Sequence, residues 1–268
     1  MKITYGTVLL VLILTVPSGM SQMKPAISVG AHYWYGMLDY STASHGDIDV
    51  DVDAAHVYGP YINIGLGKFT LGGALYMGTF GMDYGRDGVY VDDDENEYSM
   101  YPDGEHLTLN RKRTDLNLSL GVRVIPRISL FVAIKSLSYR EDDSRQVQDD
   151  DFYYNAEYDL EQTCFLYGGG FQGVVTLPRF PIFLYYSFAY LFGSMKYREE
   201  LTIDNNTASL VDDDYGTNVK SGAVGIGYRF RPGLSVTAGY RAEIMETKDT
   251  DLEEKIHGLV ITVGYTYR

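Results

Sequence analysis

The sequence is poor in the residues that support redox, metal or nucleic-acid chemistry. Cys164 is the only cysteine among 268 residues, which excludes an internal disulfide and any metal site built from several thiolates. The 22 lysine and arginine residues are outnumbered by 36 aspartate and glutamate residues, so the formal net charge is −14. A chain of this charge, with no basic stripe, repels phosphates. We therefore expect no nucleic-acid partner.

Long apolar runs are also missing. Beyond the N-terminus no segment approaches the roughly 18 consecutive apolar residues of a membrane-spanning helix. Near the N-terminus, Lys2 precedes an apolar run over residues 8–16, and the small residues Gly19 and Ser21 stand at the −3 and −1 positions of a cut before Gln22. This arrangement predicts a signal peptide over residues 1–21 and export of one domain, residues 22–268. No cysteine follows the cut, so we expect no lipid anchor.

What the sequence has in abundance is tyrosine (25 residues), glycine (29 residues) and alternation of period two. In residues 115–125, leucine and valine at even positions alternate with polar or small residues at odd positions, as in a strand with one apolar face. Similar segments recur along the chain and predict ten strands. They lie near residues 27–35, 58–66, 70–82, 115–125, 128–135, 165–175, 182–192, 224–230, 234–240 and 257–267. In segment 70–82 the two faces compete, so its orientation stays open.

The links between these strands alternate strictly between short and long. Four short links, near Gly67, Pro126, Pro178 and Pro232, carry lysine or arginine and no acid. Five links are expected to be long loops, at about 39–56, 83–114, 139–161, 196–217 and 246–255, and they hold every carboxylate except Asp115 and Glu243. This sorting is typical of an up-and-down barrel with short periplasmic turns and long external loops.

The solvation of backbone and side chains indicates which face of each strand meets lipid. Backbone groups in hydrocarbon must pair within the protein, and only a closed sheet leaves no unpaired edge. Tyrosine and phenylalanine lie near the strand ends on the apolar face, where amphipathic rings suit a membrane interface. We therefore expect the apolar face to meet lipid and the inner face to be small and polar.

The N-terminal segment, the alternating strands and the terminal segment 258–268 resemble those of the bacterial outer-membrane β-barrel superfamily. The terminal segment reads GLVITVGYTYR, with Tyr267 penultimate where that superfamily typically ends on an aromatic residue. The resemblance covers nearly all of the mature chain. It implies an all-β transmembrane antiparallel barrel of about ten strands in the cell outer membrane. It also implies outer-membrane lipid, lipopolysaccharide and the barrel-assembly machinery as partners.

A few charged residues fall on the predicted inner face. Arg123 and Arg229 are expected near the periplasmic end, with Arg268, and Lys135, Arg241 and Glu243 are expected nearer the loops; Asp115 is the other inward acid. These six lumen-lining candidates (Asp115, Arg123, Lys135, Arg229, Arg241 and Glu243) have two interpretations. They line a narrow pore and select solutes by charge, or they form salt bridges that fill a small barrel.

Acidic clusters mark the expected loops. Asp49, Asp51 and Asp53 alternate with apolar residues, so the second strand is expected to project beyond the membrane, with Arg111 and Arg113 as counter-charges. Asp92, Asp93 and Asp94 form another cluster. Oxygen-rich groups of this kind suit loosely bound Ca²⁺ or Mg²⁺, although neither has the spacing of an EF-hand loop. Solvated surface charge is the alternative, and no other cofactor is expected.

Two functions remain open from sequence. The first is a small porin-like channel for small hydrophilic solutes. The second is a plugged barrel that presents acidic external loops for adhesion, cation binding or another surface interaction. The five histidines include no Asp-x-His pair of the kind that omptin-type surface proteases use, and no Ser-His arrangement of a barrel lipid A deacylase or phospholipase is recognisable. We therefore predict that the protein is not an enzyme.

Overall fold

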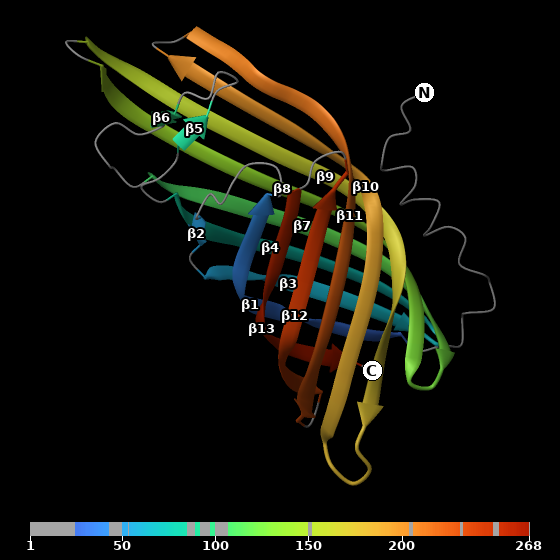
Figure 1. The fold of residues 1–268 in the computed structure, drawn as a ribbon. Helices are drawn as coiled ribbons and strands as arrows, with labels where there is room; N and C mark the ends of the chain where they lie inside the picture. Colours follow the sequence, from blue (N-terminus) through green and yellow to red (C-terminus); the bar gives the residue numbers. More distant parts are fainter. Residues whose placement is uncertain are drawn as a thin grey trace.

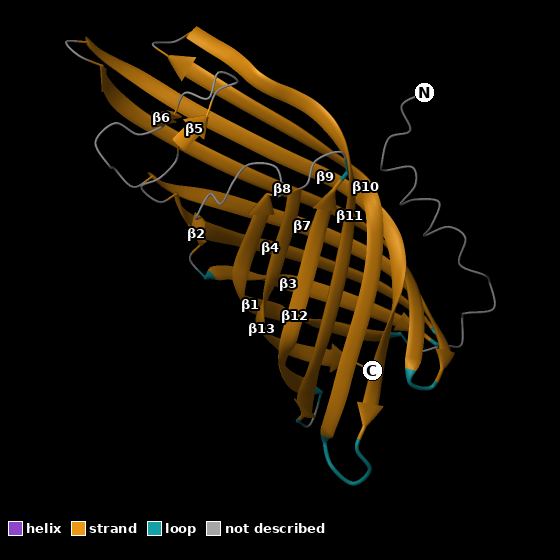
Figure 2. Ribbon diagram, in the orientation of Figure 1, coloured by secondary structure: helices purple, strands orange, loops and turns teal. Residues whose placement is uncertain are grey.

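A computed structural model describes residues 25–42, 50–52, 54–84, 89–91, 97–99, 107–149, 152–203, 206–230, 233–248 and 252–267. The described elements are all strands (Figures 1 and 2). Their bounds are β1 (Ala26–Thr42), β2 (Val50–Val52), β3 (Ala55–Leu66), β4 (Phe69–Tyr84), β5 (Val89–Val91), β6 (Glu97–Ser99), β7 (Leu107–Ile125), β8 (Ile128–Asp149), β9 (Phe152–Thr176), β10 (Ile182–Ile203), β11 (Asn206–Arg229), β12 (Leu234–Thr247) and β13 (Leu252–Tyr267). Within these residues no helix is long and apolar enough to span a membrane.

Ten long strands close into one antiparallel ring. The order around it is β1, β3, β4, β7, β8, β9, β10, β11, β12 and β13, and β1 pairs with β13 to complete the circle. The predicted ten-stranded barrel is confirmed. The short strand β2 pairs with the far end of β4, beyond β3, as expected for a second strand that projects past the barrel wall. β5 and β6 pair separately with each other.

The four predicted short links lie together at one end of the barrel, called here the turn end. A glycine at position 67 suits the β3–β4 turn because the backbone there has a φ of 62°, a region that disfavours residues with a Cβ. β1 begins and β13 ends at the same end, since Ile27 pairs with Tyr267. The opposite end is called the hairpin end.

The outer surface carries the apolar face of every strand. Leu116, Leu120 and Val124 are exposed on β7, and Leu130, Val132 and Ile134 are exposed on β8. Tyrosine and phenylalanine join this face around the ring, including Tyr35, Tyr58, Tyr167, Tyr190, Phe192, Tyr228, Phe230, Tyr240 and Tyr267. The predicted outward faces are confirmed. The structure also assigns the faces of segment 70–82, because Leu71 and Met77 are exposed on the outside while Tyr76 and Phe80 are buried inside.

Two of the five expected long loops are largely strand. β8 pairs with β9 as far as Asp149 and Phe152, and β10 pairs with β11 as far as Ile203 and Asn206. Hence the expectation of loops over 139–161 and 196–217 is wrong: these segments form two long hairpins at the hairpin end (Figure 1). Beyond lipid both strand faces meet water, so polar residues on both faces remain compatible with pairing.

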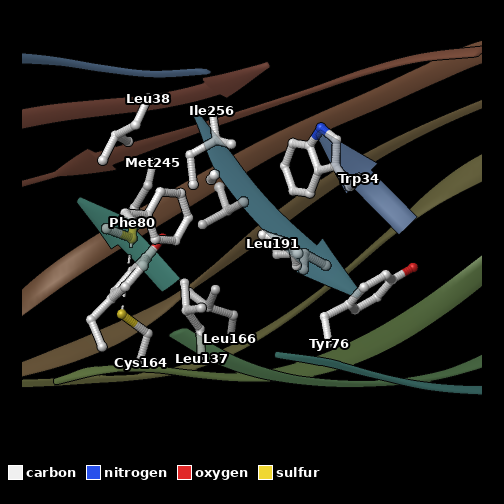
Figure 3. Close-up of a cluster of buried hydrophobic side chains, with 14 of the residues drawn as sticks. Trp34, Leu38, Tyr76, Phe80, Leu137, Cys164, Leu166, Leu191, Met245 and Ile256 are labelled. Carbon is white, nitrogen blue, oxygen red and sulfur yellow. Dashed lines mark hydrogen bonds between the residues drawn. The ribbon is translucent and has the colours of Figure 1, made fainter. Parts of the chain in front are cut away.

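The interior divides into two halves. Toward the turn end the inner face combines small, polar, half-buried side chains, among them Ser28, Asn63, Ser119 and Thr262, with aromatic rings such as those of Tyr61 and Tyr185. Toward the hairpin end they are fully buried and mostly large. Figure 3 shows part of this cluster, with Trp34, Phe80, Leu137, Leu166 and Met245 drawn around a common centre. The expectation of a small, polar inner face therefore holds only in part, and only in the turn-end half.

Candidate functional site

The candidate site is a layer of buried charged side chains that crosses the barrel interior. Arg113 and Asp115 come from β7, Lys135 comes from β8, and Arg241 and Glu243 come from β12. Each lies on the inner face by the period-two alternation that exposes its neighbours on the strand. β7 and β12 are five places apart in the ring of ten, so they face each other across the barrel.

Glu243 is the centre of this layer. Its carboxylate accepts from Arg113 Nη2 at 2.5 Å, from Lys135 Nζ at 2.7 Å and from Arg241 Nη2 at 3.1 Å. Asp115 accepts from the same Arg113 nitrogen at 2.9 Å and from Lys135 Nζ at 3.1 Å. Because Glu243 lies opposite Arg113, the ion pairs bridge the two walls of the barrel.

A second layer lies one step closer to the hairpin end. Arg111 Nε is 3.1 Å from Glu141 Oε1, and Arg111 Nη2 is 2.8 Å from Glu254 Oε1. Arg111 also donates to Gln162 on β9. Lys112 and Arg140, the outward neighbours, are exposed and charged, which places this layer above the apolar belt. Burial and the nearby Glu254 raise the pKa of Glu141, against the opposing effect of Arg111.

The two layers are electrically balanced. Arg111, Arg113, Lys135 and Arg241 supply four positive charges, and Asp115, Glu141, Glu243 and Glu254 supply four negative charges. Of the eight, Arg111, Arg113, Asp115, Lys135, Glu243 and Glu254 are each at most 3% exposed. Charges so deeply buried require close partners, because isolated ions in a protein interior are costly. The network therefore neutralises itself and leaves no excess charge of one sign.

Aromatic and apolar side chains fill the space around the charges. The guanidinium of Arg241 lies 4.6 Å from the ring of Trp34 and 5.0 Å from that of Tyr76, and Arg111 lies 4.1 Å from Tyr139. Cys164 is buried in the same packing, with its thiol 4.0 Å from the sulfur of Met245 (Figure 3). Rings of this kind cover charge while they exclude water. The result is a packed partition inside the barrel.

Four of the six lumen-lining candidates meet in this network: Asp115, Lys135, Arg241 and Glu243. The other two stand apart near the turn end, where Arg123 and Arg229 are exposed and Arg229 lies 5.5 Å from the ring of Phe183. Arg111 and Arg113 were expected to balance the Asp49, Asp51 and Asp53 series; among the described residues, both arginines have carboxylate partners inside the barrel. Arg268 lies outside the described residues.

Sequence reasoning missed Glu141, Gln162, Glu254 and Tyr76 as members of the network. Glu141 and Glu254 lie in segments expected to be loops, Gln162 directly follows one, and Tyr76 lies in segment 70–82, whose two faces compete in the sequence. Their meeting depends on which strands oppose each other and at what height, and alternation within one strand carries no such information.

The metal candidates lie mostly beyond what the structure describes. Asp49, Asp53, Asp92, Asp93 and Asp94 fall outside the described residues, and Asp51 belongs to β2 without a described side chain. Within the described part of the chain, no three histidine, cysteine, aspartate or glutamate residues gather as metal ligands. Ca²⁺ or Mg²⁺ binding by the acidic clusters stays a prediction.

No protein-family model and no curated protein matches the chain. Its structure resembles the translocator domain of the autotransporter NalP from Neisseria meningitidis, with 13% identity over 97% of this chain and 95% of that chain and a TM-score of 0.53. It also matches the outer membrane protease OmpT from Escherichia coli (11% identity, 91% and 93%, TM-score 0.42) and Ail of Yersinia pestis (8%, 92% and 100%, TM-score 0.31). The chain has the fold of bacterial outer-membrane β-barrel proteins.

Proposed function

We propose that the protein is a closed outer-membrane barrel that holds a projecting β-sheet outside the cell as an interaction surface. The observation that carries the proposal is the ion-pair layer across the interior. Arg113 and Glu243, from opposite walls, are joined at 2.5 Å and are 1% and 3% exposed. A hydrated solute would have to break these pairs to pass, at a cost of several kcal/mol for each buried charge left alone.

The outward geometry agrees with this role. β8, β9, β10 and β11 continue together past the point where their neighbours stop pairing, and they form one four-stranded sheet at the hairpin end. The apolar belt lies nearer the turn end, so lipid holds the barrel while the sheet extends into the outside medium. The proposal assigns no catalytic step and no cofactor.

A porin-like channel is the second candidate. Small polar inner residues in the turn-end half favour it, because Ser28, Asn63 and Ser119 are only half-buried. For this candidate the charge layers would have to rearrange into a conducting state. Liposome swelling separates the two functions: a closed barrel gives the swelling rate of protein-free vesicles in arabinose, whereas a porin gives a faster rate.

The orientation of the sheet is tested on intact cells with a membrane-impermeant maleimide. Cys164 is fully buried, so we expect it not to react with the maleimide, and the label reports on single cysteines introduced elsewhere. Asp213→Cys on the projecting sheet should be labelled in intact cells, and Arg179→Cys at the turn end should be labelled only after lysis. Labelling of Arg179→Cys in intact cells, with none at Asp213→Cys, would reverse the orientation and remove the proposed role.

A further inference from the structure

The projecting sheet has a backbone edge without a partner strand among the described residues. β11 begins at Asn206, but its pairing with β12 begins only at Thr217, opposite Thr247. Over residues 206–216 its paired neighbour is β10 alone. β12 ends at this level, and β13 follows after a short link. Edges of this kind present free backbone donors and acceptors to an added strand.

The usable part of this edge is short and well bounded. The pairing of β11 with β10 shifts register between Glu199 and Glu200, which leaves Leu210 as a bulge. At the other end, Gly216 O accepts from Lys248 N at 2.7 Å, so the backbone of Gly216 faces the β12 side. Backbone groups of alternate residues face the same neighbour, so Asp214 and Asp212 also turn theirs to the open side. An extended chain of about five residues fits between these limits.

Side chains decide which chain suits the edge. Asp212, Asp213 and Asp214 are all exposed. Asp214 faces outward, where Lys196 lies 3.8 Å away with three quarters of its side chain exposed, and Asp212 follows the same parity. Asp213 points to the opposite face, where Tyr215 donates to it at 3.1 Å. The edge strand therefore presents carboxylates on both faces, while the cations opposite Asp212 and Asp214, Arg198 and Lys196, belong to β10. Within the described residues no ion pair joins a cation to Asp212 or Asp213.

We propose that the β11 edge at Asp212–Asp214 binds an extended basic segment of a partner protein as an added strand. The proposal rests on the surface-interaction role proposed above and names its partner class. Because consecutive aspartates point to opposite faces, the matching segment carries consecutive lysine or arginine residues rather than one at every second position. A second copy of this chain is a poor occupant, since aspartates opposite aspartates repel.

The test uses the full-length protein refolded in nanodiscs and a fluorescent peptide with three consecutive lysines flanked by threonine and valine. Binding is followed by anisotropy at low salt. Asp212→Asn/Asp214→Asn should weaken binding at least about fivefold, as expected for two exposed ion pairs. The matched control is Asp159→Asn/Glu161→Gln, which removes the same charge from β9 of the same sheet. β9 is paired on both sides, so this control should bind nearly as well as wild type.

A second peptide separates strand addition from simple attraction between charges. It has the same side chains, with N-methyl groups on alternate backbone amides that block pairing, and its binding should fall to the background. Equal binding of the two peptides, or equal losses in the two double variants, would overturn the proposal in favour of diffuse electrostatics. Failure of every peptide to bind would also overturn it. Vesicle swelling and cysteine labelling, which test the proposed function, would be unaffected by either result.

Discussion

The two halves of the barrel interior solve the same packing problem in different ways. Toward the turn end, large aromatic rings lie against glycines: a Cβ at Gly30 would come within 2.6 Å of Tyr61, and one at Gly225 within 2.5 Å of Tyr185. Toward the hairpin end, buried ion pairs and large apolar side chains fill the space. The first arrangement leaves polar inner side chains half-buried, and the second excludes water. The proposed closure of the barrel therefore rests on the hairpin-end half.

Removing the centre of the charge layer should have the largest effect on stability. Glu243→Ala leaves Arg113 and Lys135 with Asp115 as their remaining carboxylate partner and breaks the ion pair of Arg241, and a buried ion pair broken on one side costs about 3–5 kcal/mol. Urea unfolding in lipid vesicles measures the loss. Asp159→Asn breaks the exposed pair with Arg140 instead and should cost at most about 1 kcal/mol. Similar losses in both variants would contradict a special role for the buried layer.

Arginine substitutions on the outer and inner faces of the turn-end half should give the next largest difference in the free energy of unfolding. Leu120 is 38% exposed on the lipid face, and arginine there should cost roughly 2–4 kcal/mol near the bilayer midplane. Ser119 is its inward neighbour, and Ser119→Arg reaches a polar interior at lower cost. The same vesicle titration compares them. If arginine is tolerated better at position 120 than at 119, the assigned faces are reversed.

Alanine substitutions at two glycines of β11 should change stability by smaller amounts. A side chain at Gly225 would meet Tyr185 and the backbone of Gly239, so Gly225→Ala should destabilise the barrel by about 1–3 kcal/mol through overpacking. At Gly222, also on β11, the nearest atom to a new Cβ is 3.7 Å away, an ordinary contact. Gly222→Ala should therefore leave unfolding unchanged. Equal stability of the two variants would show that the turn-end half is loosely packed.

The smallest expected effect is a pH dependence at the second charge layer. Because the pKa of Glu141 is raised in the folded barrel, the folded state holds this proton more tightly than the unfolded chain. Its contribution to stability is present at pH below the ordinary glutamate range and is lost as pH rises through the raised value. Glu141→Gln should flatten that part of the stability profile in unfolding titrations from acid to neutral pH. An unchanged profile would show that Glu141 does not titrate as described.

Alternation along the chain is enough to predict much of the fold. The turns and the outward apolar residues follow from period-two patterns, because lipid on one side enforces them. The faces of residues 70–82 could not be assigned in this way, since Tyr76 and Phe80, although buried, are as apolar as the exposed Leu71 and Met77. The hairpins of β8–β9 and β10–β11 resemble loops in sequence because water on both faces removes the alternation.

Only part of the ion-pair network could be predicted from the sequence. Arg241 and Glu243 lie two residues apart on one strand, so their pairing at 3.1 Å follows from local parity. The bridge from Glu243 to Arg113 spans 130 residues and depends on the register of the closed ring. That register is a property of the whole sheet, which no single segment specifies.

Planar-bilayer recording tests the central claim, that the hairpin-end half closes the barrel, most directly. Wild-type protein should give no stable channel events. A variant that removes the bridge and its bulk, Arg113→Ala/Glu243→Ala, should give discrete openings if it folds, as judged by its barrel circular dichroism and heat-modifiable mobility. The double variant retains Lys135 and Asp115 as its own pair and stays balanced in charge. Steady conductance by the wild-type protein would contradict the closed barrel and favour the porin-like channel.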